Sequence, residues 1–290
     1  MKRNTLDKRT KIANDIMFYI YTHIDIDIDL EELSYDLNIS KFHMHRVFKE
    51  IFYRNIYETI KSIRLQKASN LLITNKLSTI SDIAMSCGYG SQTSFIKVFK
   101  ERFSMTPKEW RNGGYKIYSN KILKEAHAVN DKFIDFSSFE PKIVKMPQMK
   151  AYYIRNQGYD DNVKDIWQKL YTWTEGHNIK NYQQIALYHD NPTITPANSC
   201  QYVACIVTDE PVGANNRLPR FTISDGVYAR FDINGVYGDV LKFIHWVYHE
   251  WLPNSGYETT VKPSYSLYHK NHFLSEDKKF EMSFFVPIEY

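Results

Sequence analysis

The chain has little cysteine and no long apolar run. Only three of its 290 residues are cysteine, an odd number that is too small for a disulfide framework and that suits a reducing compartment. No apolar stretch approaches the roughly 18 residues of a membrane span, and the polar first ten residues lack the apolar core of a signal peptide. Apolar residues still make up 43% of the chain, which excludes disorder and collagen. We therefore expect a globular, cytoplasmic protein that makes no membrane contact.

Motifs of several enzyme classes are also missing. The sequence contains no P-loop, no Gly-x-Gly-x-x-Gly signature and no Gly-x-Ser-x-Gly nucleophile elbow. His245 and His249 have the spacing of a zinc-binding pair, but no glutamate of the HExxH type lies between them and no third ligand is evident. The acidic run from Asp25 starts like a calcium loop but has Leu30 where the loop needs glycine. We expect no metal, no cofactor and no enzymatic activity.

The basic residues are concentrated in the first part of the chain. Residues 1–116 hold 19 Lys+Arg and 13 Asp+Glu, a net charge of +6, whereas the remainder holds 18 and 20, a net charge of −2. Within Lys41–Lys67 there are seven basic residues against Glu50 and Glu58. A local excess of this kind indicates a phosphate backbone as the partner more strongly than the overall charge of +4 does.

Two helix-turn-helix units are predicted in this basic part. Leu30–Phe52 and Thr79–Phe103 each have the pattern of a short helix, a tight turn and a second helix with a basic face, and a longer helix near Asn55–Thr74 lies between them. Ser40 and Ser91 are suited to cap the two second helices. Phe42, Val47, Phe48 and Ile51 form the expected inward stripe of the first of these helices. The arrangement is typical of helices that enter a DNA major groove by their N-terminal ends.

Many residues in this region stand at fixed spacings: Leu30-Glu31-Glu32-Leu33, Ser40 to Lys49 (SKFHMHRVFK), Arg64-Leu65, Ile83-Ala84, Cys87-Gly88-Tyr89, Phe95, Val98-Phe99-Lys100 and Thr106-Pro107. In these residues the chain resembles the AraC/XylS family of bacterial transcription regulators. Family members place two recognition helices in successive major grooves. The resemblance puts these helices at Lys41–Phe52 and Gln92–Phe103.

Two sets of DNA contacts follow from these helices. Residues beyond the apolar stripes are expected to reach base edges: His45, Arg46, Gln92, Thr93 and Lys97. Caps and flanking cations are expected to contact phosphates: Ser40, Lys41, Lys49, Arg54, Ser91 and Lys100. His43 is expected to pack or cap within its own domain.

The pattern changes in the second half of the chain. Residues 117–140 are predicted to be a linker, and residues 141–290 a second domain. Expected strands are Lys142–Arg155, Ile185–His189, Tyr202–Thr208, Gly226–Ile233, Pro263–His269 and Phe280–Ile288, with helices at Asp160–His177 and Tyr237–Trp251. We therefore expect an all-α DNA-binding domain of two helix-turn-helix units, residues 1–116, followed by an α+β domain with duplicated β-α-β-β halves.

The second half contains a series of short motifs: Tyr188 to Pro192 (YHDNP), Tyr202-x-x-Cys205, Gly226 to Ala229 (GVYA), Gly235-x-Tyr237, Trp251 to Tyr257 (WLPNSGY), Pro263 to Tyr268 (PSYSLY) and Val286-Pro287-Ile288. In these motifs it resembles the GyrI-like effector-binding domain, whose two halves enclose a small-molecule cleft. The effector-binding residues expected from the resemblance and the aromatic content are Tyr188, Trp246, Tyr265, Ser266 and Tyr268.

Ser266 departs from the family pattern. Proteins that resemble this domain usually carry a glutamate at this place, where it can meet a cationic ligand. A serine hydroxyl is a neutral donor and acceptor, so we expect a neutral, partly apolar effector unless Glu250 or Asp232 supplies the missing charge.

The sequence thus predicts a transcription regulator whose partners are double-stranded DNA, a small-molecule effector and RNA polymerase. Two alternatives stay open for the second domain. It can be a hydrolase of small electrophiles, for which Cys205 and Tyr188 are the candidate residues, or a module that sequesters ligands or docks proteins.

Overall fold

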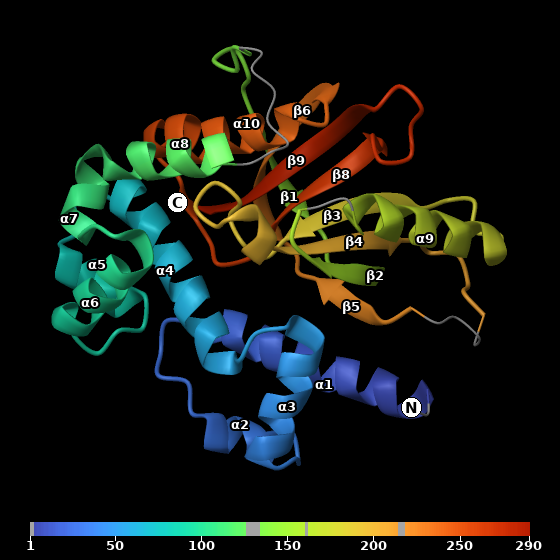
Figure 1. Cartoon of the computed structure of the whole chain (residues 1–290), viewed down its shortest axis with the longest axis horizontal. Coiled ribbons are helices and arrows are strands. Elements are labelled where there is room, and N and C mark those ends of the chain that lie inside the picture. Colours follow the sequence, from blue (N-terminus) through green and yellow to red (C-terminus); the bar gives the residue numbers. More distant parts are fainter. Residues whose placement is uncertain (1–2, 126–133, 160–161, 214–217) are drawn as a thin grey trace. The chain divides into compact units, whose positions relative to one another are not determined.

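The computed structural model describes residues 3–125, 134–159, 162–213 and 218–290, with side chains from residue 8 onward. The chain divides into two compact units, Met1–Tyr115 and Lys116–Tyr290, and each is described by itself below. Figure 1 shows helices in the first unit and a large sheet with flanking helices in the second. Among the described residues, no helix combines the length and the apolar character needed to cross a membrane.

The first unit is entirely helical. Its elements are α1 (Arg3–Thr22), α2 (Leu30–Asp36), α3 (Lys41–Phe52), α4 (Ile56–Thr74), α5 (Ile80–Ser86), α6 (Gln92–Phe103) and α7 (Pro107–Glu109), followed by a π-helical turn, Trp110–Gly114. The pairs α2–α3 and α5–α6 are the two helix-turn-helix units, and α3 and α6 have the expected bounds. Ser40 and Ser91 each accept the backbone N–H three residues ahead at 3.2 Å, so both predicted caps are present.

Aromatic side chains hold the second helix-turn-helix unit together. Phe99 and Phe103 of α6 lie 5.7 Å and 4.5 Å from the Trp110 ring, measured between centroids. The Trp110 indole N–H also donates to the Ser69 carbonyl of α4 at 3.0 Å. Because a buried N–H needs a partner, this bond fixes the end of the unit against the long central helix.

Phe42 is not in the core of the first helix-turn-helix unit. Its side chain is 77% exposed, so its assignment to the inward stripe of α3 is wrong. The buried positions of α3 are Met44, Val47, Phe48 and Phe52. Phe42 lies five residues before Val47, which is about 140° around a helix of 3.6 residues per turn. This aromatic side chain therefore projects outward from the first turn of α3.

The second unit begins with a helix where a linker was expected. Helix α8 (Tyr115–Glu125) covers the first part of residues 117–140, and residues 126–133 lie outside the described part of the chain. The other helices are α9 (Asn162–Gly176) and α10 (Asp239–Trp246), which continues into a π-helical turn, Val247–Trp251, and a short 3₁₀ turn, Leu252–Asn254. A second 3₁₀ turn spans Ala197–Ser199.

The strands of the second unit form one curled antiparallel sheet. They are β1 (Lys142–Met146), β2 (Met149–Gln157), β3 (Gln183–Tyr188), β4 (Gln201–Val207), β5 (Arg220–Ile223), β6 (Gly226–Val236), β7 (Glu258–Thr259), β8 (Ser264–Lys270) and β9 (Lys279–Glu289). The spatial order is β1-β6-β9-β8-β3-β4-β2-β5, and β7 pairs with β9. The expected single strand Lys142–Arg155 is two strands, because Pro147 lacks the N–H that a continuous ladder needs.

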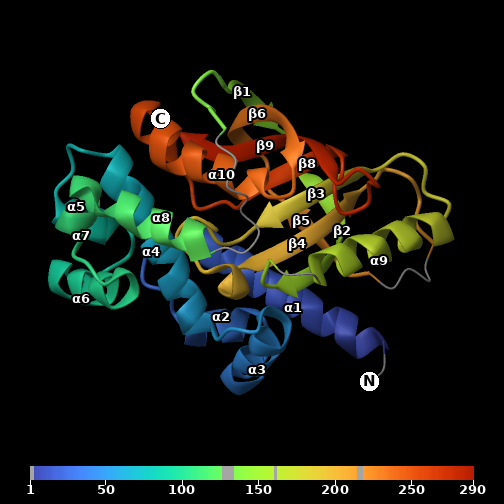
Figure 2. The same cartoon turned by 45° about the horizontal axis from the view of Figure 1, so that its top comes forward.

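Helices α9 and α10 cover the same face of this sheet (Figure 2). Trp167 of α9 and Phe243 of α10 belong to one buried cluster with alternate residues of β3, β6 and β9. Intervening residues of the strands form a second cluster on the opposite face, around Tyr265 and Phe285. The two faces therefore have separate cores, and only the helix-covered face contributes to the cavity described below.

Candidate functional site

The outward face of α3 carries a group of side chains that contact one another. Arg46 is exposed, and its Nη2 lies 3.0 Å from Nδ1 of His43. The Arg46 guanidinium carbon lies 6.0 Å from the centre of the Phe42 ring. His43, which was expected to pack or cap within its own domain, contacts Arg46 of the same helix. These contacts restrict the Arg46 side chain, so it loses less conformational freedom when it binds a partner.

His45 and Lys41 already have partners within the first unit. The His45 ring stacks on Tyr57 of α4 at 5.6 Å, and its pKa is lowered by burial and by the nearby Lys41. The imidazole is therefore held neutral, with hydrogen-bonding edges rather than a charge to offer. Lys41 pairs with Glu31 at the surface, a type of contact worth little in water that an incoming phosphate can replace.

The outward face of α6 is polar and exposed. Gln92, Thr93, Lys97 and Lys100 are all exposed along it, and Ser91 caps its first turn. Lys49 on α3 is exposed as well, and Arg54 is partly buried. Helix α4 lies between the two helix-turn-helix units. Its 19 residues correspond to about 28 Å of helix, at 1.5 Å per residue. Figure 1 shows α4 running between the two helix-turn-helix units.

The second unit contains a cavity of about 670 Å³, a size that suits a drug-sized molecule. Its walls come from α8, α9, α10, the ends of β2, β3, β4 and β8, and the loops next to them. The lining residues are Ile122, Glu125, Gln157, Tyr159, Val163, Tyr188, Pro192, Pro196, Ala197, Asn198, Tyr202, Tyr237, Val240, Leu241, Ile244, Tyr268, His272 and Phe273. Aromatic and aliphatic side chains dominate this list, so the cavity favours a flat, largely apolar molecule.

Four tyrosines meet in the cavity wall. The Tyr159 ring lies edge-on to Tyr188 and Tyr202, with centroids 6.0 Å and 5.5 Å apart. The Tyr202 hydroxyl accepts the indole N–H of Trp167 at 2.9 Å, and the Tyr188 and Ser266 hydroxyls lie 3.1 Å apart. Tyr268 bonds to both Tyr188 and Tyr202. Burial raises the pKa of all four phenols, so they act as neutral hydrogen-bonding groups.

The expected effector residues divide between the cavity and the core. Tyr188 and Tyr268 line the cavity, whereas Trp246, Tyr265 and Ser266 do not. Tyr265 and Tyr268 are three residues apart on β8, and successive strand residues point to opposite faces, so the two cannot share a wall. Tyr265 stacks on Phe285 at 4.5 Å on the far face of the sheet. Trp246 packs on Phe231 and Phe243 in the helix-covered core.

Ser266 lies behind the cavity wall rather than in it. Its side chain is fully buried and supports the Tyr188 hydroxyl. The two carboxylates named as substitutes are also engaged elsewhere: Asp232 with Arg230 at 2.8 Å and Glu250 with Lys116 at 3.1 Å. Neither lines the cavity. Among the described lining residues, Glu125 of α8 carries a carboxylate. The sequence analysis did not name this residue.

Other lining residues were also missed, for different reasons. Tyr202 could have been predicted from the alternation of strand residues. Tyr202, Ala204 and Ile206 alternate along β4 and share the helix-covered face with Ala186 and Tyr188. Tyr159 and His272 lie in loops just after strands. No periodicity in the sequence predicts which way a loop residue faces.

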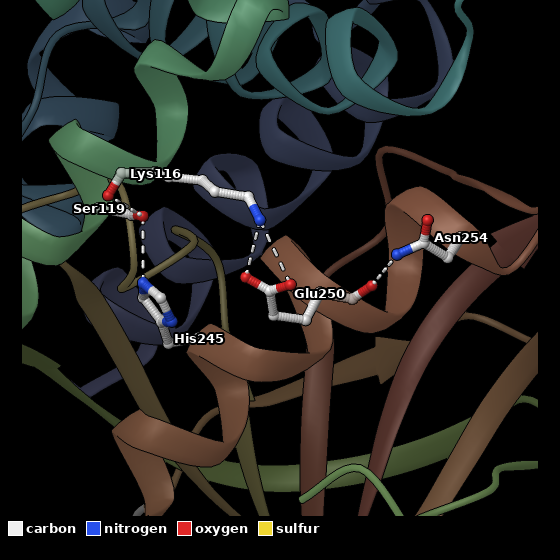
Figure 3. A network of polar contacts seen from close by, with 5 residues as sticks. All are labelled: Lys116, Ser119, His245, Glu250 and Asn254. Atoms are coloured by element: carbon white, nitrogen blue, oxygen red, sulfur yellow. Dashed lines mark hydrogen bonds and ion pairs between the residues drawn. The ribbon is translucent and has the colours of Figure 1, made fainter.

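His245, on α10, and His249, in the π-helical turn that follows it, both take part in a network of polar contacts. His245 Nε2 lies 3.1 Å from the Ser119 hydroxyl of α8, and His249 Nε2 lies 2.8 Å from the Thr193 hydroxyl. Figure 3 shows Ser119 facing His245 and Lys116 facing Glu250, whose backbone carbonyl accepts the Asn254 amide. Among the described residues no group of three or more metal-ligating side chains comes together.

Acid is expected to destabilise the second unit through its buried histidines. Burial lowers the pKa of His245 and of His272 to about 4, and lowers that of His249 as well. The unfolded chain therefore binds more protons than the folded chain below about pH 6.5, and stability falls as pH falls toward 4. Between pH 7 and pH 5 each of the first two histidines should cost about 2 kcal/mol of unfolding free energy.

Urea unfolding followed by tryptophan fluorescence measures this loss. The His245→Gln variant keeps a hydrogen-bonding group beside Ser119, but glutamine does not titrate in this range. The unfolding free energy of this variant should therefore fall by about 2 kcal/mol less than that of the wild type between pH 7 and pH 5. A pH profile unchanged by this substitution would contradict the assignment.

Comparison with known proteins identifies both units. Residues 139–289, more than half of the chain, match the GyrI-like small molecule binding domain, and residues 33–113 match a helix-turn-helix domain. Regulatory protein SoxS of Escherichia coli (strain K12) is 32% identical over 102 residues, which are 35% of this chain and 94% of SoxS. The probable transcription factor PqrA of Proteus vulgaris is 30% identical over 105 residues, 36% of this chain and 85% of PqrA. The chain is an AraC-family transcription regulator.

The second unit of this regulator belongs to the GyrI-like family. The solved structure of the EcmrR C-terminal domain aligns with 52% of this chain and 98% of its own, at 18% sequence identity and a TM-score of 0.41. The regulator thus combines an N-terminal helix-turn-helix DNA-binding region with a C-terminal domain of the small-molecule-binding type.

Proposed function

We propose that this regulator binds its operator by inserting α3 and α6 into successive major grooves of one DNA face. The observation that carries the proposal is the pair of capped, outward-polar helices at the two ends of α4. Helix α4 is about 28 Å long, which is close to the roughly 34 Å between successive major grooves. In this arrangement the N-terminal turns of both helices point their exposed side chains at base edges.

Specificity would come from five residues and affinity from six. The base-contacting residues are His45, Arg46, Gln92, Thr93 and Lys97, and the phosphate-contacting residues are Ser40, Lys41, Lys49, Arg54, Ser91 and Lys100. We add Phe42, because an exposed aromatic ring at the start of α3 can contact a thymine methyl group.

The test is selection of bound duplexes from a random pool, followed by a salt titration on the selected operator. About six phosphate contacts should give a slope of about −5 in a plot of log binding constant against log salt concentration. Recovery of no specific duplex would overturn the DNA-binding proposal, and a slope near zero would overturn the phosphate assignments.

We further propose that the cavity of the second unit holds the effector, and that the effector is neutral and partly apolar. The apolar lining and the buried serine at position 266 support this ligand class. A cation that enters a low-dielectric site needs an opposing charge within it. Both Asp232 and Glu250 are already engaged with other cations, so neither supplies that charge.

The remaining sequence-based expectations fit this proposal. We propose domains at residues 1–116 and 141–290, with α8 of the segment between them added to the cavity wall, and a duplication of a β-α-β-β unit in the second domain. The strand order supports the duplication, because β5-β2-β4-β3 on one side mirrors β1-β6-β9-β8 on the other. The protein would act in the bacterial cytoplasm, where the chromosome lies, with RNA polymerase as a further partner.

The alternative functions of the second domain find less support. Cys205 is fully buried on β4, and burial raises the pKa of its thiol, which keeps it protonated and a poor nucleophile. The Tyr188 hydroxyl is buried against Ser266 and has no base beside it in the described network. Hydrolysis is therefore disfavoured, and a purely sequestering module would not need the exposed polar faces of α3 and α6.

A further inference from the structure

Polar groups in the cavity wall differ in whether they already have partners. Of the four tyrosines, Tyr188, Tyr202 and Tyr268 bond to one another or to Ser266 and Trp167. The Tyr159 hydroxyl is buried and has no hydrogen-bond partner among the described residues. Its backbone is fixed, since the Tyr159 N–H donates to the Ala197 carbonyl at 3.1 Å. The Tyr159 backbone is therefore fixed, and its hydroxyl has no partner among the described residues.

His272 is the second unpaired group. The side chain is 6% exposed, lines the cavity, and finds no partner for either ring nitrogen in the described part of the chain. Aromatic neighbours hold the ring, with Phe273 at 4.0 Å, Tyr237 at 5.5 Å and Tyr268 at 5.7 Å. Burial lowers the pKa of His272 to about 4, so at neutral pH it offers one N–H donor and one nitrogen acceptor.

Buried polar groups in native proteins almost always have a partner, and an unpaired group facing a cavity is available to whatever fills it. We propose that Tyr159 and His272 are the polar anchors of the effector, and that the effector is an uncharged aromatic molecule carrying both a hydrogen-bond acceptor and a donor. This inference rests on the proposed effector function of the cavity and adds the ligand's chemistry. Ile122, Val163, Leu241 and Ile244 supply the apolar walls around the ring system.

A cationic ligand has weaker support in this cavity. Glu125 is the carboxylate among the described lining residues, and its side chain is 59% exposed. Its Oε1 lies 3.9 Å from the Lys121 ammonium one turn earlier on α8. Solvent and this lysine both screen its charge, so the carboxylate contributes little selectivity for a cation.

Two fluorescent probes with the same ring system separate these possibilities. Acridone is uncharged and carries one carbonyl acceptor and one N–H donor, whereas N-methylacridinium is a cation without an N–H. Fluorescence titration of the full chain should give an acridone affinity at least tenfold above that for N-methylacridinium. Tyr159→Phe and His272→Phe should each weaken acridone binding about tenfold and change N-methylacridinium binding less than twofold.

Tyr248→Phe is the matched control, because its buried hydroxyl already bonds to that of Ser264 and the residue is not among those that line the cavity. It should change acridone affinity less than about twofold and lower the melting temperature. Tyr159→Phe should instead raise the melting temperature of the ligand-free protein, because it removes a buried hydroxyl without a partner. A purely structural tyrosine would give the opposite shift, so melting separates an anchor from a core residue.

Several outcomes would overturn the inference. They are no binding of acridone to the wild-type chain, acridone binding unchanged in both anchor variants, or tighter binding of N-methylacridinium that Glu125→Gln abolishes. The proposed DNA-binding function is tested separately by operator selection without any ligand. Its failure is therefore distinguishable from a failure of the ligand assignment.

Discussion

Replacing Gly88 with alanine is expected to destabilise the first unit by about 3–5 kcal/mol and to abolish operator binding. Gly88 follows α5 in the turn of the second helix-turn-helix unit and has a φ of +75°, a conformation that favours glycine. An added Cβ would lie 2.6 Å from the Ile24 carbonyl oxygen and 2.7 Å from Nη2 of Arg64. The first of these atoms is backbone and cannot move away cheaply.

The same substitution also disturbs the bonds of Arg64. Its Nε donates to the Ile24 carbonyl at 3.0 Å and its Nη2 donates to the Ile26 carbonyl. These bonds tie α4 to the segment that joins α1 and α2. A side chain at position 88 would push the guanidinium away and remove the donor to the partly buried Ile24 carbonyl. The damage therefore reaches both helix-turn-helix units, although the change is made in only one.

Gly90→Ala is the matched control in the same turn. A Cβ at Gly90 would have no neighbour within 4 Å, and its φ lies outside the left-handed region. We expect this variant to change the unfolding free energy by less than about 0.5 kcal/mol. Urea titration followed by far-ultraviolet circular dichroism compares the two variants. Equal stability of Gly88→Ala and the wild type would show that the turn has another accessible conformation.

The helical unit was predictable because its signals are local. A capping serine acts within three residues, so the starts of α3 and α6 could be predicted. The apolar spacing indicates a helix and its buried face, and both helices have their expected bounds. The error at Phe42 has the same origin. An aromatic residue close to an apolar stripe was counted into it without regard to its angle around the helix.

The cavity was less predictable because its geometry is non-local. Strand parity alone would have separated Tyr265 from Tyr268, and that information was present in the sequence. The positions of Tyr159, His272 and Glu125 depend on loops and on a helix that only the folded chain brings to the sheet. No spacing rule connects residues 125, 159 and 272, so these could not be derived from the sequence.

Arg46→Ala and Lys97→Ala are expected to weaken binding at different halves of the operator. Each should cost about 2 kcal/mol, or about thirtyfold in affinity, if it removes a base contact. Arg46 is on α3 and Lys97 is on α6, so each footprint should lose protection at one groove only. Because the two positions are on separate helices, the double variant should lose nearly the sum of both free energies.

Lys49→Ala is the control that separates base reading from phosphate binding. Lys49 is exposed on the same helix as Arg46 but is assigned to the backbone. Its loss should weaken binding to all sequences alike and reduce the salt slope by about 1. Arg46→Ala should instead relax the preference at one base pair, measured by binding to operators substituted position by position.

The contact between Arg46 and His43 at 3.0 Å predicts that His43→Ala has a smaller effect at that same base pair, because the arginine loses its support but not its hydrogen-bond donors. If Arg46→Ala and Lys49→Ala weakened all operators equally, the recognition face of α3 would have to be reassigned.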